Sequence, residues 1–318
     1  MADRELYPSL RVCRNAPVRR QRLPGITLAA PFLLLTLAST SRALGREAED
    51  PEGKKIRPVV STEVSLTSKY VWRGQRLTDD WSLQPSATVG LGKLSVNVWG
   101  TMDLTAVNQG DSLFLPDNPA APAGTHHGLQ GRFSEVDYTF SLARHYAGTF
   151  VEGGAIVYTF PHRGDSLAST VEVYGGITFE EVPLSPILRV FVDVDEARRA
   201  GDPGLYVQAL AGRSLQFRGR VFPAVDISAS VAFVNSGFGN AYYGTPVSGL
   251  HDVNLRFTLP FCRTEKVSAA GFVSFSGLVG EFRNFQARNL RDVYRGSAGG
   301  PASYADTVWG GLSVSLFF

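Results

Sequence analysis

Apolar and polar residues alternate along segments of about ten residues from residue 57 to the end of the chain. In Ser134–Ala143 the apolar positions are Val136, Tyr138, Phe140 and Leu142. A period of two is typical of β-strands that have one apolar and one polar face. Twelve such segments begin near residues 59, 83, 94, 132, 149, 170, 187, 204, 225, 250, 267 and 305, and no later stretch shows sustained helical periodicity. The pattern predicts an all-β fold.

The connections between the predicted strands alternate between short and long. Short turns are expected at 92–93, 146–148, 181–185 and 262–266, with 216–223 somewhat longer. The other connections are mostly longer and rich in Gly, Pro, Asn and Asp, at 74–82, 106–131, 161–168, 197–203, 236–249 and 277–304. An even number of strands with short turns at one end and long loops at the other is the layout of outer-membrane barrels. We therefore expect a transmembrane antiparallel up-and-down β-barrel.

The first 43 residues have the composition of an export signal. Six arginines lead into the apolar run Ile26–Ala38, which is followed by small residues. The run is too short to span a bilayer comfortably and fits the three-part plan of a secretory signal peptide. We expect 1–43 to be a cleaved signal peptide, 44–58 a short N-terminal periplasmic segment and 59–318 the barrel, located in the bacterial outer membrane. An uncleaved N-terminal membrane anchor is the alternative.

The last predicted strand ends on an aromatic residue. Thr307–Phe318 places Val308, Leu312, Val314 and Leu316 on the same face as the terminal Phe318. A final strand that ends in Phe resembles the signal that outer-membrane barrels present to the barrel-assembly machinery. We expect Phe318 to serve that purpose and the apolar outer face to contact outer-membrane lipid and lipopolysaccharide.

The first predicted strand also ends in aromatics, in the stretch SKYVWRGQ. If the alternation of Val60–Leu66 continues, Tyr70 and Trp72 fall on the apolar face, with Lys69 and Arg73 on the polar face. The pattern thus predicts that Tyr70 and Trp72 face lipid near the headgroups and that the two cations face a watery lumen.

This stretch and the following strands resemble the TorF-like porin family of Gram-negative outer-membrane β-barrel proteins. The similarity is carried by Ser68, Tyr70, Arg73 and Gly74, then by Gln84-Pro85 and by Val98-Trp99-Gly100. Later pieces, such as EVDYTFSLA and LSPILRVFVDVDE, are also similar. The resemblance implies an outer-membrane barrel with a porin-like role.

Charged residues on the polar parity are candidates for lining a pore. The strongest are Lys69, Arg73, Asp103, Glu135, Asp137, Arg189, Asp193 and Arg256. Acidic residues on this parity outnumber basic ones, so an open lumen is expected to favour cations weakly. We expect a channel for passive diffusion of small polar solutes, which requires no cofactor. The alternative is a closed structural or surface-binding barrel, filled by salt bridges, that displays its long extracellular loops.

Other functions have weaker support in the sequence. The chain beyond the signal is mildly acidic, which gives no basis for nucleic-acid binding. Some outer-membrane barrels hydrolyse lipids with a Ser–His pair, so His145, His162 and His251 are candidates, but no Gly-x-Ser-x-Gly accompanies them. The adjacent His126-His127 would make a poor chelate. We expect neither an enzyme nor a metal site, and we interpret Arg163-Gly164-Asp165 as a tight turn.

Overall fold

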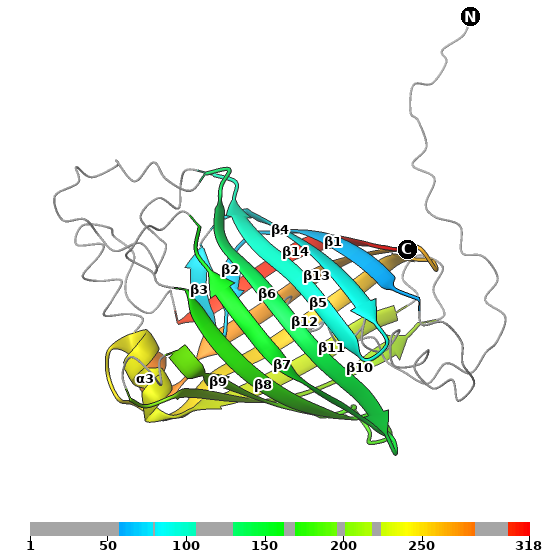
Figure 1. The fold of residues 1–318 in the computed structure, drawn as a ribbon. Helices are drawn as coiled ribbons and strands as arrows, with labels where there is room; N and C mark the ends of the chain where they lie inside the picture. The colour runs from blue at the N-terminus through cyan, green and yellow to red at the C-terminus, as the bar shows by residue number, and fades with distance from the viewer. Residues whose placement is uncertain are drawn as a thin grey trace, which may run out of the picture.

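Twelve antiparallel strands close into a barrel (Figure 1). The computed structural model describes residues 57–78, 80–105, 130–161, 169–195, 201–217, 224–283 and 305–318. Each barrel strand pairs with its neighbours in sequence, apart from an inserted pair of short strands, and β1 pairs with β14 to complete the ring. The predicted all-β up-and-down architecture is confirmed, and every predicted strand begins within one residue of an observed one.

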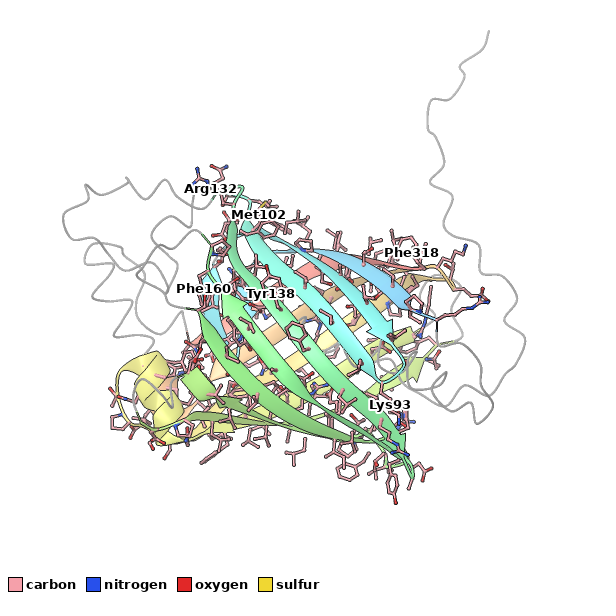
Figure 2. All side chains as sticks on the ribbon, viewed as in Figure 1. Lys93, Met102, Arg132, Tyr138, Phe160 and Phe318 are labelled. Carbon is pink, nitrogen blue, oxygen red and sulfur yellow. The ribbon has the colours of Figure 1, made fainter. Side chains whose placement is uncertain are left out.

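The barrel strands are β1 (Val59–Thr67), β4 (Ser82–Leu91), β5 (Leu94–Asp103), β6 (Phe133–Tyr146), β7 (Thr149–Thr159), β8 (Thr170–Phe179), β9 (Ile187–Asp193), β10 (Gly204–Gln216), β11 (Ala224–Val234), β12 (Gly249–Arg263), β13 (Val267–Leu278) and β14 (Asp306–Phe317). One end of the barrel, the short-turn end, carries Lys93 and Phe318 (Figure 2). Met102, Arg132 and Phe160 lie at the opposite, long-loop end.

The barrel is apolar outside and polar inside. On β6, Phe140 and Leu142 are 50% and 56% exposed, whereas the intervening Thr139 and Ser141 are buried. The same alternation recurs on the other strands, so large apolar side chains cover the outer surface (Figure 2). A soluble protein does not expose so much contiguous apolar surface, but a lipid-facing barrel must. No helix in the described part of the chain is long and apolar enough to cross a membrane.

Tyr70 and Trp72, which were predicted to point outward to lipid, lie in a short hairpin inside the barrel. After β1 ends at Thr67, the chain forms β2 (Tyr70–Trp72) and β3 (Gln75–Thr78), which pair only with each other. The prediction that Tyr70 and Trp72 face lipid was wrong. The alternation of β1 does not continue past Thr67, because the chain bends at Ser68 and Lys69. The prediction that 74–82 is an irregular loop was also wrong, since this segment contains β3.

The hairpin contacts the inner wall on several sides. Its Tyr70 hydroxyl donates to Glu135 on β6, and its Thr78 hydroxyl donates to Asp103 on β5. Leu77 is only 2% exposed. We call the segment Tyr70–Thr78 the internal hairpin.

Helix α3 (Ser236–Tyr243) lies at the long-loop end, where no helix was predicted. It begins after Asn235, whose side chain accepts a hydrogen bond from the Phe238 amide. It ends at Gly244, which has the left-handed conformation typical of a helix C-terminus. The helix has only eight residues, too few for its periodicity to stand out in the sequence.

We predict that reversing the polarity of one outward position destabilises the barrel strongly. Phe140→Arg, near the middle of β6, should lower the free energy of unfolding by about 2–4 kcal/mol, the usual cost of Arg facing the bilayer midplane. Phe140→Leu is the matched control and should cost much less, since it remains apolar. Urea titration of the protein in lipid vesicles measures both. Equal stability of the two variants would contradict the lipid-facing assignment.

Candidate functional site

The tip of the internal hairpin spans the lumen. Arg73 and Gly74 form its turn with φ values of 47° and 74°. A Cβ added at Gly74 would lie 2.6 Å from the Cβ of Asp252 on β12, so only glycine allows the tip to approach this wall. Arg73 reaches in another direction, to β8. The hairpin tip is therefore held between distant parts of the wall.

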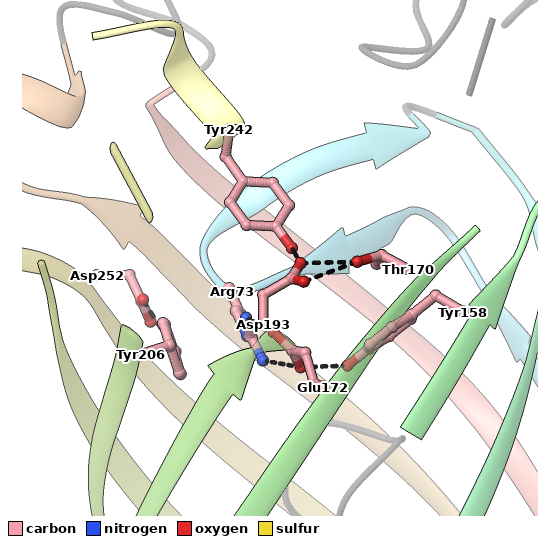
Figure 3. A network of polar contacts seen from close by, with 8 residues as sticks. All are labelled: Arg73, Tyr158, Thr170, Glu172, Asp193, Tyr206, Tyr242 and Asp252. Atoms are coloured by element: carbon pink, nitrogen blue, oxygen red, sulfur yellow. Dashed lines mark hydrogen bonds and ion pairs between the residues drawn. The ribbon is translucent and has the colours of Figure 1, made fainter. Parts of the chain in front are cut away.

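Arg73 makes the strongest contact of the tip. Its Nη1 and Nη2 each donate to one carboxylate oxygen of Glu172, both at 2.7 Å (Figure 3). Its Cζ lies 4.3 Å from the ring centroid of Tyr206 and 4.5 Å from that of Trp72. A bidentate pair and two aromatic faces compensate the charge of a guanidinium that has almost no contact with solvent.

Tyrosine hydroxyls hold the surrounding carboxylates. Tyr158 donates to the same Glu172 at 2.8 Å, and Tyr206 donates to Asp252 at 3.0 Å. Asp193 accepts from Tyr242 of α3 at 3.1 Å and from the Thr170 hydroxyl (Figure 3). Burial, and then the negative charge of Glu172, raise the pKa of Tyr242 well above its ordinary value. The Tyr242 hydroxyl is therefore protonated and donates to Asp193.

Aromatic rings pack between the internal hairpin and α3. Trp72 stacks on Phe238 at 6.4 Å between ring centroids and contacts Tyr242 at 5.3 Å. It also meets Tyr158 of β7 edge-on. Since Phe238 is completely buried, this packing leaves little room for water at the long-loop end.

A cavity lies beside the hairpin, within the barrel. Trp72 and Arg73 line it from the hairpin, and Gln208, Asn254 and Arg256 line it from the wall. Its volume is about 80 Å³. The interior thus combines a packed region around the hairpin with a cavity that is lined by both polar and aromatic residues.

The eight predicted lumen residues lie in several different environments. Asp103 and Glu135 accept hydrogen bonds from the internal hairpin, and Arg73 is part of the hairpin and binds Glu172. Asp193 accepts a hydrogen bond from Tyr242 of α3. The remaining charges are placed as follows: Arg189 donates to Glu152 at 2.9 Å, Arg256 lines the cavity, Asp137 is fully buried, and Lys69 is half-buried beside the first bend. Whether these residues line an open water pathway stays a prediction.

Several interior residues were missed by the sequence interpretation. Glu152 lies on the buried parity of β7, which could have indicated it as a partner of Arg189. Tyr158 and Tyr206 also face inward, but a large aromatic ring on a barrel strand is normally assigned to the lipid face. Their hydroxyl groups were the available signal, because a buried Tyr hydroxyl needs a polar partner.

His145 and His251, the two candidate histidines that the structure describes, each contact a carboxylate. His251 is completely buried, with Nδ1 2.8 Å from Asp252 and Nε2 2.8 Å from the Tyr243 hydroxyl. Because a carboxylate only accepts, Nδ1 carries a proton in this contact. His145 faces Glu180 at 3.2 Å on the short-turn side. His251 thus anchors α3 to β12.

The other chemical candidates fall largely outside the described residues. This applies to His162, His126-His127 and Arg163-Gly164-Asp165. In the part of the chain that the structure describes, no group of three or more His, Cys, Asp or Glu residues could hold a metal ion.

Comparisons with known proteins place the chain among barrels only by architecture. No family model and no curated protein matches it. Among solved structures, an outer-membrane channel from Pseudomonas putida F1 matches with a TM-score of 0.36 and 11% identity over 85% of this chain and 98% of that one. The NanC porin matches with a TM-score of 0.42 and 8% identity over 81% and 98%.

A distant similarity to an enzyme is also found. The outer-membrane phospholipase A from Escherichia coli has a TM-score of 0.36 and 13% identity over 86% of this chain and 96% of that one. Similarity at this level does not define a family or an activity. The resemblance to TorF-like porins stays a prediction.

We predict that the Arg73–Glu172 pair is coupled energetically. Glu172→Gln should lower the free energy of unfolding by about 3 kcal/mol, because it leaves a buried guanidinium without its counter-charge. The double variant Arg73→Met/Glu172→Gln should cost less than the sum of the two single changes, since it removes both charges. Urea titrations of the four proteins in vesicles give the coupling energy. Additive costs would show that the pair does not hold the hairpin.

Proposed function

We propose that the protein is an outer-membrane channel for passive diffusion of small polar solutes. The observation that supports this most is a cavity, lined by both polar and aromatic residues, within a closed barrel that has an apolar outer face. A barrel of twelve strands has a lumen of intermediate width. It is wider than that of eight-stranded barrels, which side chains fill, and narrower than the channel of general porins.

The internal hairpin is the proposed constriction. Trp72 and Arg73 both contact the ring of Phe238 from α3, and both also line the cavity. A solute that enters from the long-loop end therefore has to pass this contact between the hairpin, β7 and α3. Such a constriction suits a narrow, selective channel more than a general porin, because only small or well-matched solutes pass.

The proposed setting is the bacterial outer membrane. Short turns of such barrels face the periplasm and long loops face outside, so the internal hairpin lies on the extracellular side. We further propose that residues 1–43 are removed on export and that Phe318, which is 75% exposed at the short-turn end, presents the C-terminal signal to the assembly machinery. A TorF-like porin role without catalysis fits this arrangement.

The predicted lumen charges take part in this proposal. Lys69, Arg73, Asp103, Glu135, Asp137, Arg189, Asp193 and Arg256 would set the field along the pathway. The carboxylates around the hairpin would favour cations there, and Arg256 would weaken that preference in the cavity. The second candidate function, a closed barrel that displays surface loops, is favoured by the dense packing of Trp72 between Phe238 and Tyr158.

Current through single molecules decides between these two functions. The purified protein, inserted into a planar bilayer, should give discrete conductance steps smaller than those of a general porin under the same salt. The folded state is verified by its altered gel mobility before heating. A folded barrel that passes no current would reject the channel and support the closed barrel.

We predict that removing the internal hairpin widens the pathway. Residues 69–80 can be replaced by Asn-Gly, which makes a tight turn between the paired residues Thr67 and Ser82. Single-channel conductance should rise severalfold, because the aromatic and charged tip no longer occupies the lumen. Trp81→Ala is the control in the same connection, since Trp81 is exposed, and it should leave conductance unchanged. An unaltered conductance after excision would exclude the hairpin as the constriction.

A further inference from the structure

The cavity beside the internal hairpin has a wall whose charged groups already have partners within the protein. These groups are the guanidiniums of Arg73 and Arg256. Arg73 donates to both carboxylate oxygens of Glu172. Arg256 stacks on the ring of Phe272, and its charge interacts with that of Glu63. The other polar side chains of the described lining are uncharged, so hydrogen bonding is the main contact that the wall has left for a guest.

Two uncharged, buried donors of this wall have no hydrogen-bond partner among the described residues. They are the indole Nε1 of Trp99 and the hydroxyl of Ser274, and both residues are 4% exposed and line the cavity. A buried donor that lacks a partner costs free energy, so such groups normally bind a ligand or an ordered water. The indole only donates, whereas the hydroxyl both donates and accepts. A guest that satisfies both groups needs at least two oxygen atoms that can accept.

Aromatic rings and amides complete the wall. Trp72 of the hairpin and Trp309 of β14 line the cavity, and the indole of Trp309 donates to Ser276 at 3.3 Å. Since its N–H has a partner, Trp309 offers a guest mainly the face of its ring. The amides of Gln84 and Asn254 reach the same cavity, and an amide both donates and accepts. Aromatic faces with a few convergent polar groups are the usual composition of a small-molecule site.

The volume of the cavity limits the size of the guest. A space of about 80 Å³ holds only a few water molecules, so it admits a compound of a few carbons and excludes an oligosaccharide. A short carbon chain with a hydroxyl group on each carbon meets the requirements of the wall. Its oxygens both accept and donate, and its C–H groups can lie on the aromatic rings.

We propose that this cavity binds a small uncharged polyol, of the size of glycerol, through Trp99 and Ser274. The inference rests on the proposed channel function and names the class of solute that passes the hairpin. One hydroxyl oxygen of the guest accepts from the indole Nε1 of Trp99, and a second hydroxyl binds the side chain of Ser274. The carbons of the guest lie against the rings of Trp72 and Trp309. An ionic guest is disfavoured, because it would lose its hydration to a wall whose arginines already have partners.

Saturation-transfer NMR of the full-length mature protein, folded in a detergent without a sugar headgroup, measures the binding of glycerol without any current. Glycerol should bind saturably. Propan-1-ol has the same carbon skeleton with one hydroxyl, and glycerate has a carboxylate in place of one hydroxymethyl group. Each should bind about fivefold more weakly, the usual effect of one lost hydrogen bond. Equal binding of propan-1-ol would overturn the role of the hydroxyls, equal binding of glycerate would overturn the preference for an uncharged guest, and no saturable binding of glycerol would overturn the site.

Conservative variants assign the two contacts. Trp99→Phe removes the N–H but keeps an aromatic ring, and Ser274→Ala removes only the hydroxyl. Each should weaken glycerol binding about fivefold. The matched controls are Trp81→Phe, at an exposed position, and Ser95→Ala, at a buried position that does not line the cavity, and both should bind like the unmodified protein. Unchanged affinity in the folded Trp99 and Ser274 variants would overturn the proposal.

The channel and the polyol site fail in distinguishable ways. Conductance without glycerol binding leaves the channel intact and removes the site. Binding without conductance leaves the site intact and removes the channel, so that the barrel becomes a binding protein. When both hold, the entry of glycerol into proteoliposomes, followed by their swelling, should saturate in the same concentration range as binding. Entry that rises linearly with concentration would show that the site does not lie on the pathway, and would overturn its role in selecting the solute.

Discussion

The interior of this barrel depends on compensating one buried positive charge. Arg73 is carried into the lumen by a turn that requires left-handed backbone at Arg73 and Gly74, and a buried guanidinium is tolerated only if it is paired and hydrogen-bonded. Glu172 supplies both oxygens, and the rings of Tyr206 and Trp72 supply two faces. Because β8 and β10 contribute these groups, the pair joins the hairpin to the wall, and the position of the hairpin follows from it.

Most of the other interior contacts are consequences of that placement. With the hairpin in the lumen, Tyr70 reaches Glu135, and Trp72 meets the aromatic side of α3. Helix α3 is then held by Tyr242 on Asp193 and by Tyr243 on His251. Direct side-chain contacts therefore connect the hairpin, α3 and the barrel wall at the long-loop end.

The barrel could be predicted from the sequence because strand parity is a local property. Phe140 and Thr139 differ in polarity, and one residue of shift exchanges the lipid and lumen faces, so the pattern and the register are tightly linked. The internal hairpin could not be predicted in this way. Tyr70 and Trp72 continue the apolar parity of β1, and only contacts with distant strands show that they turn inward. The alternation within each strand indicates that Arg189 and Glu152 face inward, but nothing local in the sequence indicates that they pair with each other.

The distribution of charge also explains why a count of lumen residues is a poor guide to selectivity. Glu172 and Glu152 are each neutralised by an arginine, and Asp252 is held by Tyr206 and His251. These carboxylates act mainly as acceptors that position the hairpin and α3. Arg256 lies on the ring of Phe272 and lines the cavity beside the hairpin. The location of each compensating partner, and not the number of acidic residues, therefore decides the charge that the lumen presents.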